Sequence, residues 1–163
     1  DIRDIMKHPP WGSFVAPDET NYMMMHCIIV GPEDTPYEKG FFYFVVTFPS
    51  DYPMTAPKVL FMPTGAGKVR FNPNLYKCGK VCLSILGRKH AVAHCPQPSL
   101  VRFCPLTWPR PEWSPGLNLT SILVSIQSLL CEKPYHNEPG YDTERVPGDS
   151  VRYNNILRYE TLR

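Results

Sequence analysis

Prolines restrict the fold of this chain more than any other residue type, because 19 of them are spread along its 163 residues. A proline supplies no backbone N–H and disfavours a helical conformation in the residue before it. Their dispersed distribution predicts many fixed turns, and it differs from the clustered composition of a disordered proline-rich tract. The regular elements between these turns are therefore expected to be short.

Four segments have the composition of β-strands. Residues 22–30 and 41–48 are short, rich in aromatic or β-branched side chains, and bounded by turn formers such as Gly31-Pro32. Residues 15–17 and 58–61 are placed to flank them. Antiparallel neighbours need only short connections, so the pattern predicts an antiparallel meander of four strands.

Three helices are expected around this sheet. Residues 2–7 are typical of the last turns of a helix that His8-Pro9-Pro10 stops, and we expect the start of this helix to be missing. A long helix is predicted after Asn118, which is suited to capping it, and its apolar stripe is expected to pack on the sheet. The stripe consists of Leu119, Ile122, Leu123, Ile126, Leu129 and Leu130, and a terminal helix is indicated by Tyr153, Ile156, Leu157 and Leu162. The sequence thus predicts an α+β fold.

The length of the chain and its charge indicate a single domain and argue against nucleic-acid and membrane partners. A chain of 163 residues suits one domain with one core, and its formal charge of +2 comes without a concentrated basic cluster. We therefore expect no nucleic-acid partner. No apolar run approaches the ~20 residues that cross a bilayer, so no membrane partner is expected either.

The six cysteines show no regular spacing that would indicate a disulfide framework. Cys27 and Cys131 lie inside apolar runs and are interpreted as core thiols. A reducing compartment is the simpler expectation.

A candidate for chemistry is Cys82, which follows the turn Phe71-Asn72-Pro73-Asn74 by eight residues after Asn74. A thiol can hold an acyl group, and a neutral amide can donate a hydrogen bond to a developing oxyanion. The pair therefore predicts acyl transfer. The alternative is that Cys82 is only a small buried hydrophobe and that Asn74 only holds the turn.

Three more blocks, in order, decide between these interpretations: residues 31–42, residues 52–61 and Trp113-Ser114-Pro115. Together with the Cys82 motif they resemble the catalytic domain of the ubiquitin-conjugating enzymes, from about Asp1 to about Asp142. Asn72 stands where that family usually has histidine. This detail and residues 82–87 and 134–140 resemble the Z subtype.

The resemblance implies an α+β ubiquitin-conjugating-enzyme fold as one domain over residues 1–163, truncated at its N-terminus. The gap between Cys82 and Trp113 is longer than in the family pattern, which predicts an insertion at about residues 88–106. A loop of this length is functional or disordered, or it is an isoform peculiarity.

The implied activity is that Cys82 accepts ubiquitin or a ubiquitin-like modifier as a thioester from an activating enzyme and passes it to a substrate lysine. Exchange of one thioester for another is near-balanced, so positioning the two sulfurs is the main task. In the second step, Asn74 is assigned to the charge on the thioester oxygen. Glu138, before Pro139, or His136 in the same loop is expected to meet the attacking amine. No metal or organic cofactor is implied, because ATP is consumed by the upstream activating enzyme.

The same resemblance implies partner surfaces. Pro53 and Met54, with Ser114 and Pro115, are expected to bind ubiquitin ligases, and Leu83 is expected to contact the tail of the modifier. The Z subtype implies the second, non-classical activating enzyme as the donor. We further expect a monomer in the cytoplasm and nucleus.

Three rival interpretations stay open. Cys78-x3-Cys82 followed by His90-x3-His94 has local spacings that zinc ligands use, although it would occupy the predicted nucleophile. A cysteine hydrolase would use Cys82 with one of His90, His94 or His136 as base. A catalytically inactive adaptor or isoform would bind modifier or ligase without turnover, because the insertion lies close to Cys82.

Overall fold

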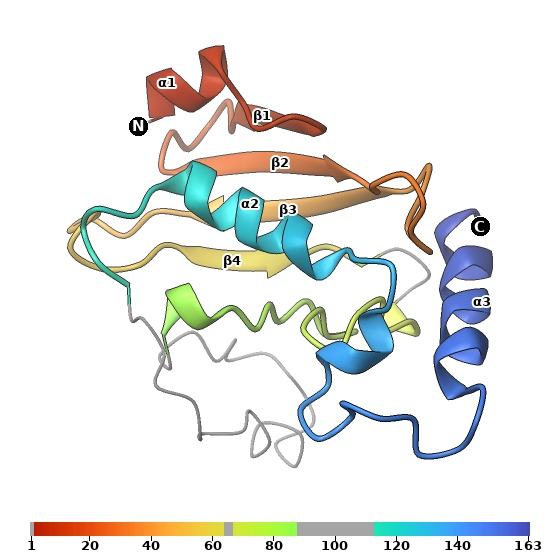
Figure 1. The fold of residues 1–163 in the computed structure, drawn as a ribbon. Helices are drawn as coiled ribbons and strands as arrows, with labels where there is room; N and C mark the ends of the chain where they lie inside the picture. The colour runs from red at the N-terminus through yellow and green to blue at the C-terminus, as the bar shows by residue number, and fades with distance from the viewer. Residues whose placement is uncertain (1, 64–66, 88–112) are drawn as a thin grey trace.

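The structure is a computed structural model that describes residues 2–63, 67–87 and 113–163 (Figure 1). Its centre is one antiparallel sheet of four strands in the order β1-β2-β3-β4. Val15 pairs with Cys27, Cys27 with Phe44, and Phe44 with Phe61. The strands are β1 (Ser13–Pro17), β2 (Met24–Val30), β3 (Phe41–Thr47) and β4 (Lys58–Phe61). The predicted meander is confirmed.

The predicted start of the second strand was two residues early. Strand β2 begins at Met24, whose backbone N–H donates to the carbonyl of Asn21 at 2.8 Å. Tyr22 therefore belongs to a turn, where its side chain is 80% exposed. Aromatic composition alone does not separate the end of a strand from an adjoining turn.

The long helix α2 (Leu119–Leu129) crosses one face of the sheet (Figure 1). Asn118 caps it as predicted, since its side chain accepts from the N–H of Ser121 at 2.9 Å while the Ser121 hydroxyl accepts from the N–H of Asn118 at 3.4 Å. Alternate strand residues face this helix and form the core with it. Members of this core are Met25, Cys27, Ile29, Phe42, Phe44, Val46, Leu119, Ile122, Leu123 and Ile126.

Two further α-helices of the described ranges lie at the margins, α1 (Ile2–Lys7) beside β1 and α3 (Asp149–Thr161) beyond one end of the sheet (Figure 1). The terminal helix is confirmed, and two of the four residues that indicated it, Tyr153 and Leu157, join the core or pack against it. Leu157 is buried, whereas Ile156 is 60% and Leu162 69% exposed.

The two cysteines expected in the core differ. Cys27 is fully buried, and burial raises the pKa of its thiol to about 12, so it stays protonated and unreactive. Cys131 is only half-buried, and its thiol lies 3.8 Å from the Asn137 side-chain oxygen. The prediction of a core thiol was therefore wrong for Cys131, because it follows the end of α2 and leaves the apolar stripe.

The predicted insertion at residues 88–106 lies outside the described residues, and the single-domain assignment over 1–163 stays a prediction. Nowhere in the described ranges is there a helix both long enough and apolar enough to cross a bilayer.

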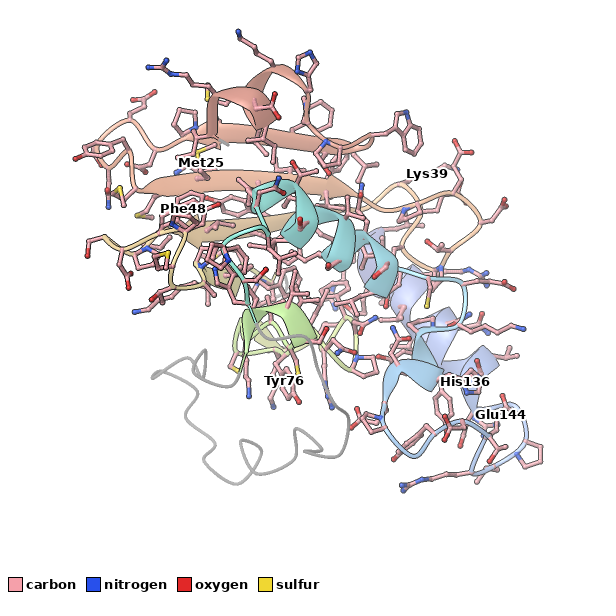
Figure 2. All side chains as sticks on the ribbon, turned by 60° about the vertical axis from the view of Figure 1, so that its left-hand side comes forward. Met25, Lys39, Phe48, Tyr76, His136 and Glu144 are labelled. Atoms are coloured by element: carbon pink, nitrogen blue, oxygen red, sulfur yellow. The ribbon has the colours of Figure 1, made fainter. Side chains whose placement is uncertain are left out.

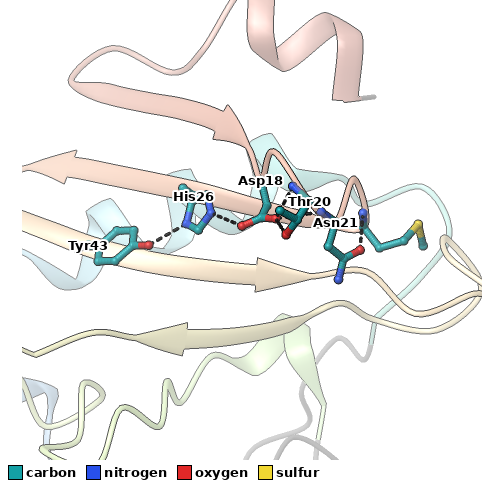
Figure 3. Close-up of polar contacts among 6 residues, drawn as sticks. Asp18, Thr20, Asn21, His26 and Tyr43 are labelled. Atoms are coloured by element: carbon teal, nitrogen blue, oxygen red, sulfur yellow. Dashed lines mark hydrogen bonds and ion pairs between the residues drawn. The ribbon is translucent and has the colours of Figure 1, made fainter.

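A polar cluster joins the β1–β2 turn to the sheet (Figure 3). The carboxylate of Asp18 accepts from the Thr20 hydroxyl at 2.7 Å and lies 2.9 Å from Nε2 of His26. On its other side, His26 Nδ1 lies 2.6 Å from the Tyr43 hydroxyl. Because Asp18 accepts only, Nε2 carries a proton, and the imidazole links the turn to β3.

This cluster predicts a loss of stability in acid. The Thr20 hydroxyl, followed by His26 and the Thr20 and Asn21 amides, lowers the pKa of Asp18 below its ordinary 3.8. A lowered folded-state pKa stabilises the fold above pH 3.8, and that stabilisation is lost as pH falls below this value. Thermal melts of Asp18→Asn should show a lower Tm than the unaltered protein near neutral pH, with the gap closing below pH 3.8. A gap that stays constant into strong acid would contradict the role given to this carboxylate.

Candidate active site

The predicted pair Cys82 and Asn74 is brought together by reciprocal hydrogen bonds. The backbone N–H of Cys82 donates to the carbonyl of Asn74 at 2.8 Å. In return, the side-chain amide of Asn74 donates to the carbonyl of Cys82 at 2.9 Å. Cys82 is half-buried just before η2 (Ser84–Leu86), so part of the residue is open to solvent. The turn and the cysteine thus form one rigid unit.

Asn74 retains unused capacity in this arrangement. Its amide nitrogen has two hydrogens, and the Cys82 carbonyl takes one of them. Its Oδ1 is buried without a partner in the described part of the chain. An amide fixed through one N–H can present the other to a substrate oxygen, so holding the turn and binding an oxyanion are compatible roles.

The turn is anchored from beneath by Asn72, which is fully buried. Its side-chain nitrogen donates to the Tyr37 hydroxyl at 2.9 Å and to the Leu129 carbonyl at 2.8 Å. Its side-chain oxygen accepts from the N–H of Asn74 at 2.9 Å. Asn72 therefore connects the turn to the end of α2 and orients Asn74.

Tyr37 is a second supporting residue, and the sequence analysis did not identify it. Its hydroxyl donates to the Phe71 carbonyl at 2.8 Å. Burial raises the pKa of Tyr37 above its ordinary 10, so the hydroxyl keeps the proton it donates. The turn carrying Tyr37 requires glycine at Gly31, where a Cβ would lie 1.7 Å from the Tyr37 carbonyl oxygen.

Glu138, predicted to meet the attacking amine, is ion-paired. Its Oε2 lies 3.1 Å from Nη2 of Arg70, and the same nitrogen donates to the carbonyl of Pro73. The loop after α2 is thereby fastened to the Asn-Pro turn. Arg70 carried no signal in the sequence that would have marked it as part of the site.

His136 lies in η3 (Pro134–Asn137), as its label in Figure 2 shows. Its Nδ1 lies 2.6 Å from the Tyr141 carbonyl. A carbonyl only accepts, so Nδ1 carries the proton and Nε2 of the neutral ring is a proton acceptor. The geometry thus gives His136 the form of imidazole that general-base chemistry needs.

The four residues predicted to bind ligases come from two loops that touch. Trp113 Nε1 donates to the Pro53 carbonyl at 2.7 Å, which holds residues 113–115 against the loop that follows β3. Pro53, Ser114 and Pro115 are exposed, and Met54 is 70% exposed. These four residues, which we call the ligase surface, therefore lie exposed on two adjoining loops, where the apolar Met54 side chain can contact a protein partner.

Leu83, predicted to contact the modifier, is instead part of the core and only 8% exposed. Its position after Cys82 does not expose its side chain, because the chain turns inward before η2. The residue therefore offers little surface to a modifier.

The zinc alternative also involved His90 and His94, which lie outside the described residues. Within the described ones, no group of three or more His, Cys, Asp or Glu side chains gathers as a metal site.

Comparison with known proteins gives consistent matches. The family model described as "Ubiquitin-conjugating enzyme" matches residues 1–148. The human "Ubiquitin-conjugating enzyme E2 Z" is 51% identical over 163 residues, which are 100% of this chain and 41% of that protein. The "Probable ubiquitin-conjugating enzyme protein 17" of Caenorhabditis elegans is 41% identical over 91% of this chain and 19% of its own length. The human "Dual E2 ubiquitin-conjugating enzyme/E3 ubiquitin-protein ligase BIRC6" is 45% identical over 92% of this chain and 3% of its own length. The chain thus spans less than half the length of these relatives.

Proposed function

Since this chain belongs to the family of ubiquitin-conjugating enzymes, we propose that it carries ubiquitin or a ubiquitin-like modifier as a thioester on Cys82 and passes it to a lysine. The observation that carries this proposal is the reciprocal hydrogen bonding of Cys82 and Asn74, which fixes an amide donor on the backbone of the cysteine. Acyl transfer mainly requires a sulfur nucleophile and a hydrogen-bond donor held in a fixed position.

In the first step the Cys82 thiolate attacks the thioester carbonyl of the charged activating enzyme. The new C–S bond forms, the bond to the donor sulfur breaks, and the donor leaves as a thiolate. In the second step a lysine amine attacks the Cys82 thioester, and the carbonyl oxygen becomes negative. The second N–H of Asn74 stabilises this oxygen, and the intermediate collapses to an amide with release of the Cys82 thiolate.

The attacking amine must lose a proton, and we assign this role to the loop that holds His136 and Glu138. Nε2 of His136 is an acceptor because Nδ1 is bound to the Tyr141 carbonyl. The Glu138 carboxylate is bound to Arg70, which restricts its position. Neither step uses a metal or organic cofactor, and ATP enters only through the activating enzyme that supplies the thioester.

The partners follow from the family and the exposed surfaces. We propose the second, non-classical activating enzyme as donor, ubiquitin ligases at the Pro53, Met54, Ser114 and Pro115 surface, and a monomeric enzyme acting in the cytoplasm and nucleus. The similarity to E2 Z supports the choice of activating enzyme, and the exposed Met54 side chain supports the ligase site. The net charge of +2 offers no basis for a nucleic-acid or membrane partner.

The proposal is tested by ATP-dependent charging with the classical and the second activating enzymes in parallel. Products are resolved on gels with and without a thiol reductant. We expect an adduct that the reductant removes, formed with the second enzyme. No adduct with either enzyme, from protein that melts cooperatively, would favour an inactive adaptor instead.

Met54→Ala should weaken the effect of ligases. An exposed apolar side chain at a loop tip is a typical anchor, so its loss is expected to reduce ligase-stimulated transfer by about tenfold. Transfer to free lysine without a ligase should change little. Met62→Ala is the matched control, because Met62 is 40% exposed but follows β4 outside this surface. Equal effects of both substitutions would remove Met54 from the ligase site.

A further inference from the structure

Arg70 makes contacts that none of the roles above explains. It directly precedes the Phe71-Asn72-Pro73-Asn74 turn, and its Nη2 binds two acceptors far apart in the chain. One is the carbonyl of Pro73, and the other is Oε2 of Glu138 at 3.1 Å, 68 residues away. A single guanidinium nitrogen therefore joins the turn that carries Asn74 to the loop after α2.

The contact with Pro73 fixes a particular peptide group. The carbonyl of Pro73 and the N–H of Asn74 belong to the same planar unit. Arg70 binds the carbonyl end, and Asn72 Oδ1 accepts from the N–H end at 2.9 Å. A peptide held at both ends cannot rotate, so the starting point of the Asn74 side chain is set in part by Arg70.

The orientation of the guanidinium is itself supported. Its Cζ lies 4.4 Å from the ring centroid of Tyr76. Tyr76, labelled in Figure 2, belongs to the segment between the turn and Cys82. Lys80 Nζ lies 5.4 Å from the same ring. Cation–π contacts of this kind favour a fixed plane for arginine. Nε of Arg70 is buried without an acceptor in the described ranges. The hydrogen bonds of Nη2 therefore determine where the guanidinium lies.

We propose that Arg70 is a positioning residue of the acyl-transfer step and that Glu138 is its counter-ion, which orients Asn74 through Arg70 instead of accepting the proton of the lysine. The inference rests on the proposed function, because it concerns the transfer of the modifier from Cys82. It assigns proton acceptance in this loop to His136, whose Nε2 is the acceptor nitrogen when Nδ1 donates to the Tyr141 carbonyl. The Arg70 and Glu138 side chains are 38% and 31% exposed, so we expect the pair to matter for geometry more than for stability.

The test follows single-turnover discharge of the charged protein onto free lysine at several lysine concentrations. Arg70→Met should lower the maximal rate by about tenfold and leave the half-saturating lysine concentration unchanged, because positioning acts on the reaction and not on lysine binding. Arg70→Lys keeps the charge and should recover part of the rate. Arg152→Met is the matched control, since it breaks the remote Arg152–Asp149 pair of 2.6 Å on α3 and should discharge normally.

Glu138 variants separate a counter-ion from a proton acceptor. Glu138→Ala should slow discharge by about tenfold, and Glu138→Gln should recover most of that loss, because a glutamine oxygen still accepts from Arg70. Combining Arg70→Met with Glu138→Ala should be no slower than Arg70→Met alone, since both remove the same contact. Glu138→Gln as slow as Glu138→Ala, or multiplying effects in the double variant, would overturn the proposal.

A readout independent of activity keeps the inference distinct from the proposed function. Hydrogen exchange at the backbone N–H of Asn74 should be about tenfold faster in Arg70→Met than in the unaltered protein, and it should not change in Arg152→Met. If the unaltered protein cannot be charged, the proposed function fails while this measurement still decides the positioning role. Unchanged exchange in Arg70→Met would show that Arg70 does not hold the turn.

Discussion

Replacing Asn74 by alanine is expected to slow transfer from Cys82 to lysine by about 10²- to 10³-fold, the usual cost of removing one oxyanion donor. The expectation follows from the amide nitrogen, which binds the Cys82 carbonyl through one N–H at 2.9 Å and has another for the thioester oxygen. Charging of Cys82 should fall much less, because its nucleophile is a thiolate, which is intrinsically very nucleophilic and depends less on an oxyanion donor.

Measuring the two steps separately distinguishes the two roles of Asn74. If Asn74 only held the turn of residues 71–74, its replacement would slow charging of Cys82 and transfer to lysine equally. If it is the oxyanion donor, its replacement slows transfer to lysine selectively. Asn154→Ala is a closely matched control, since its side-chain nitrogen also donates to a backbone carbonyl, that of Glu132, at 2.8 Å, and its Oδ1 is also buried without a partner among the described residues. Discharge of Asn74→Ala at the rate of Asn154→Ala would refute the oxyanion role.

Asn72→Ala is expected to lower the free energy of unfolding by about 3 kcal/mol, through unpaired buried groups and the cavity left behind. The substitution leaves the Asn74 N–H without its acceptor and removes the donor that the Tyr37 hydroxyl accepts from. The Leu129 carbonyl keeps one donor, the Asn137 side chain at 3.1 Å, which limits the loss. The Asn74 turn should loosen at the same time.

Urea unfolding near neutral pH measures this effect, with a midpoint shift at constant slope as the expected form. Asn155→Ala is the control, because Asn155 is exposed on α3 and its replacement should change the free energy of unfolding by less than about 0.5 kcal/mol. Tyr37→Phe combined with Asn72→Ala should lose less than the sum of the two single variants, since both act on one hydrogen bond. Additive losses would mean that the buried network is not a unit.

Local sequence patterns predicted the parts of this molecule that depend on neighbouring residues. The strand composition of β3, the Asn118 cap and the Asn74–Cys82 pair all act over eight residues or fewer, and the structure places them as expected. Residues near element ends were predicted less well: Cys131, interpreted as a core thiol, is half-buried, and Leu83, expected to contact the modifier, is buried. Alternation and period no longer hold where the chain turns.

The supporting network could not be predicted from the sequence by such reasoning. Asn72 meets Tyr37 across 35 residues, and Arg70 meets Glu138 across 68. Contacts of this range depend on how the sheet, the turn and the loop after α2 pack together, and no spacing in one sequence records that. Polar residues beside a recognised motif are where such contacts should be sought.

The central claim is that the Cys82 sulfur carries the modifier, and the most direct measurement is the bond formed by Cys82→Ser. Charged with ATP and the activating enzyme, the unaltered protein and Cys78→Ser should give adducts that a thiol reductant removes. Cys82→Ser should give an adduct that resists the reductant, because an oxygen ester replaces the thioester. A reductant-sensitive adduct on Cys82→Ser would contradict the account, because the modifier would then be held by another sulfur.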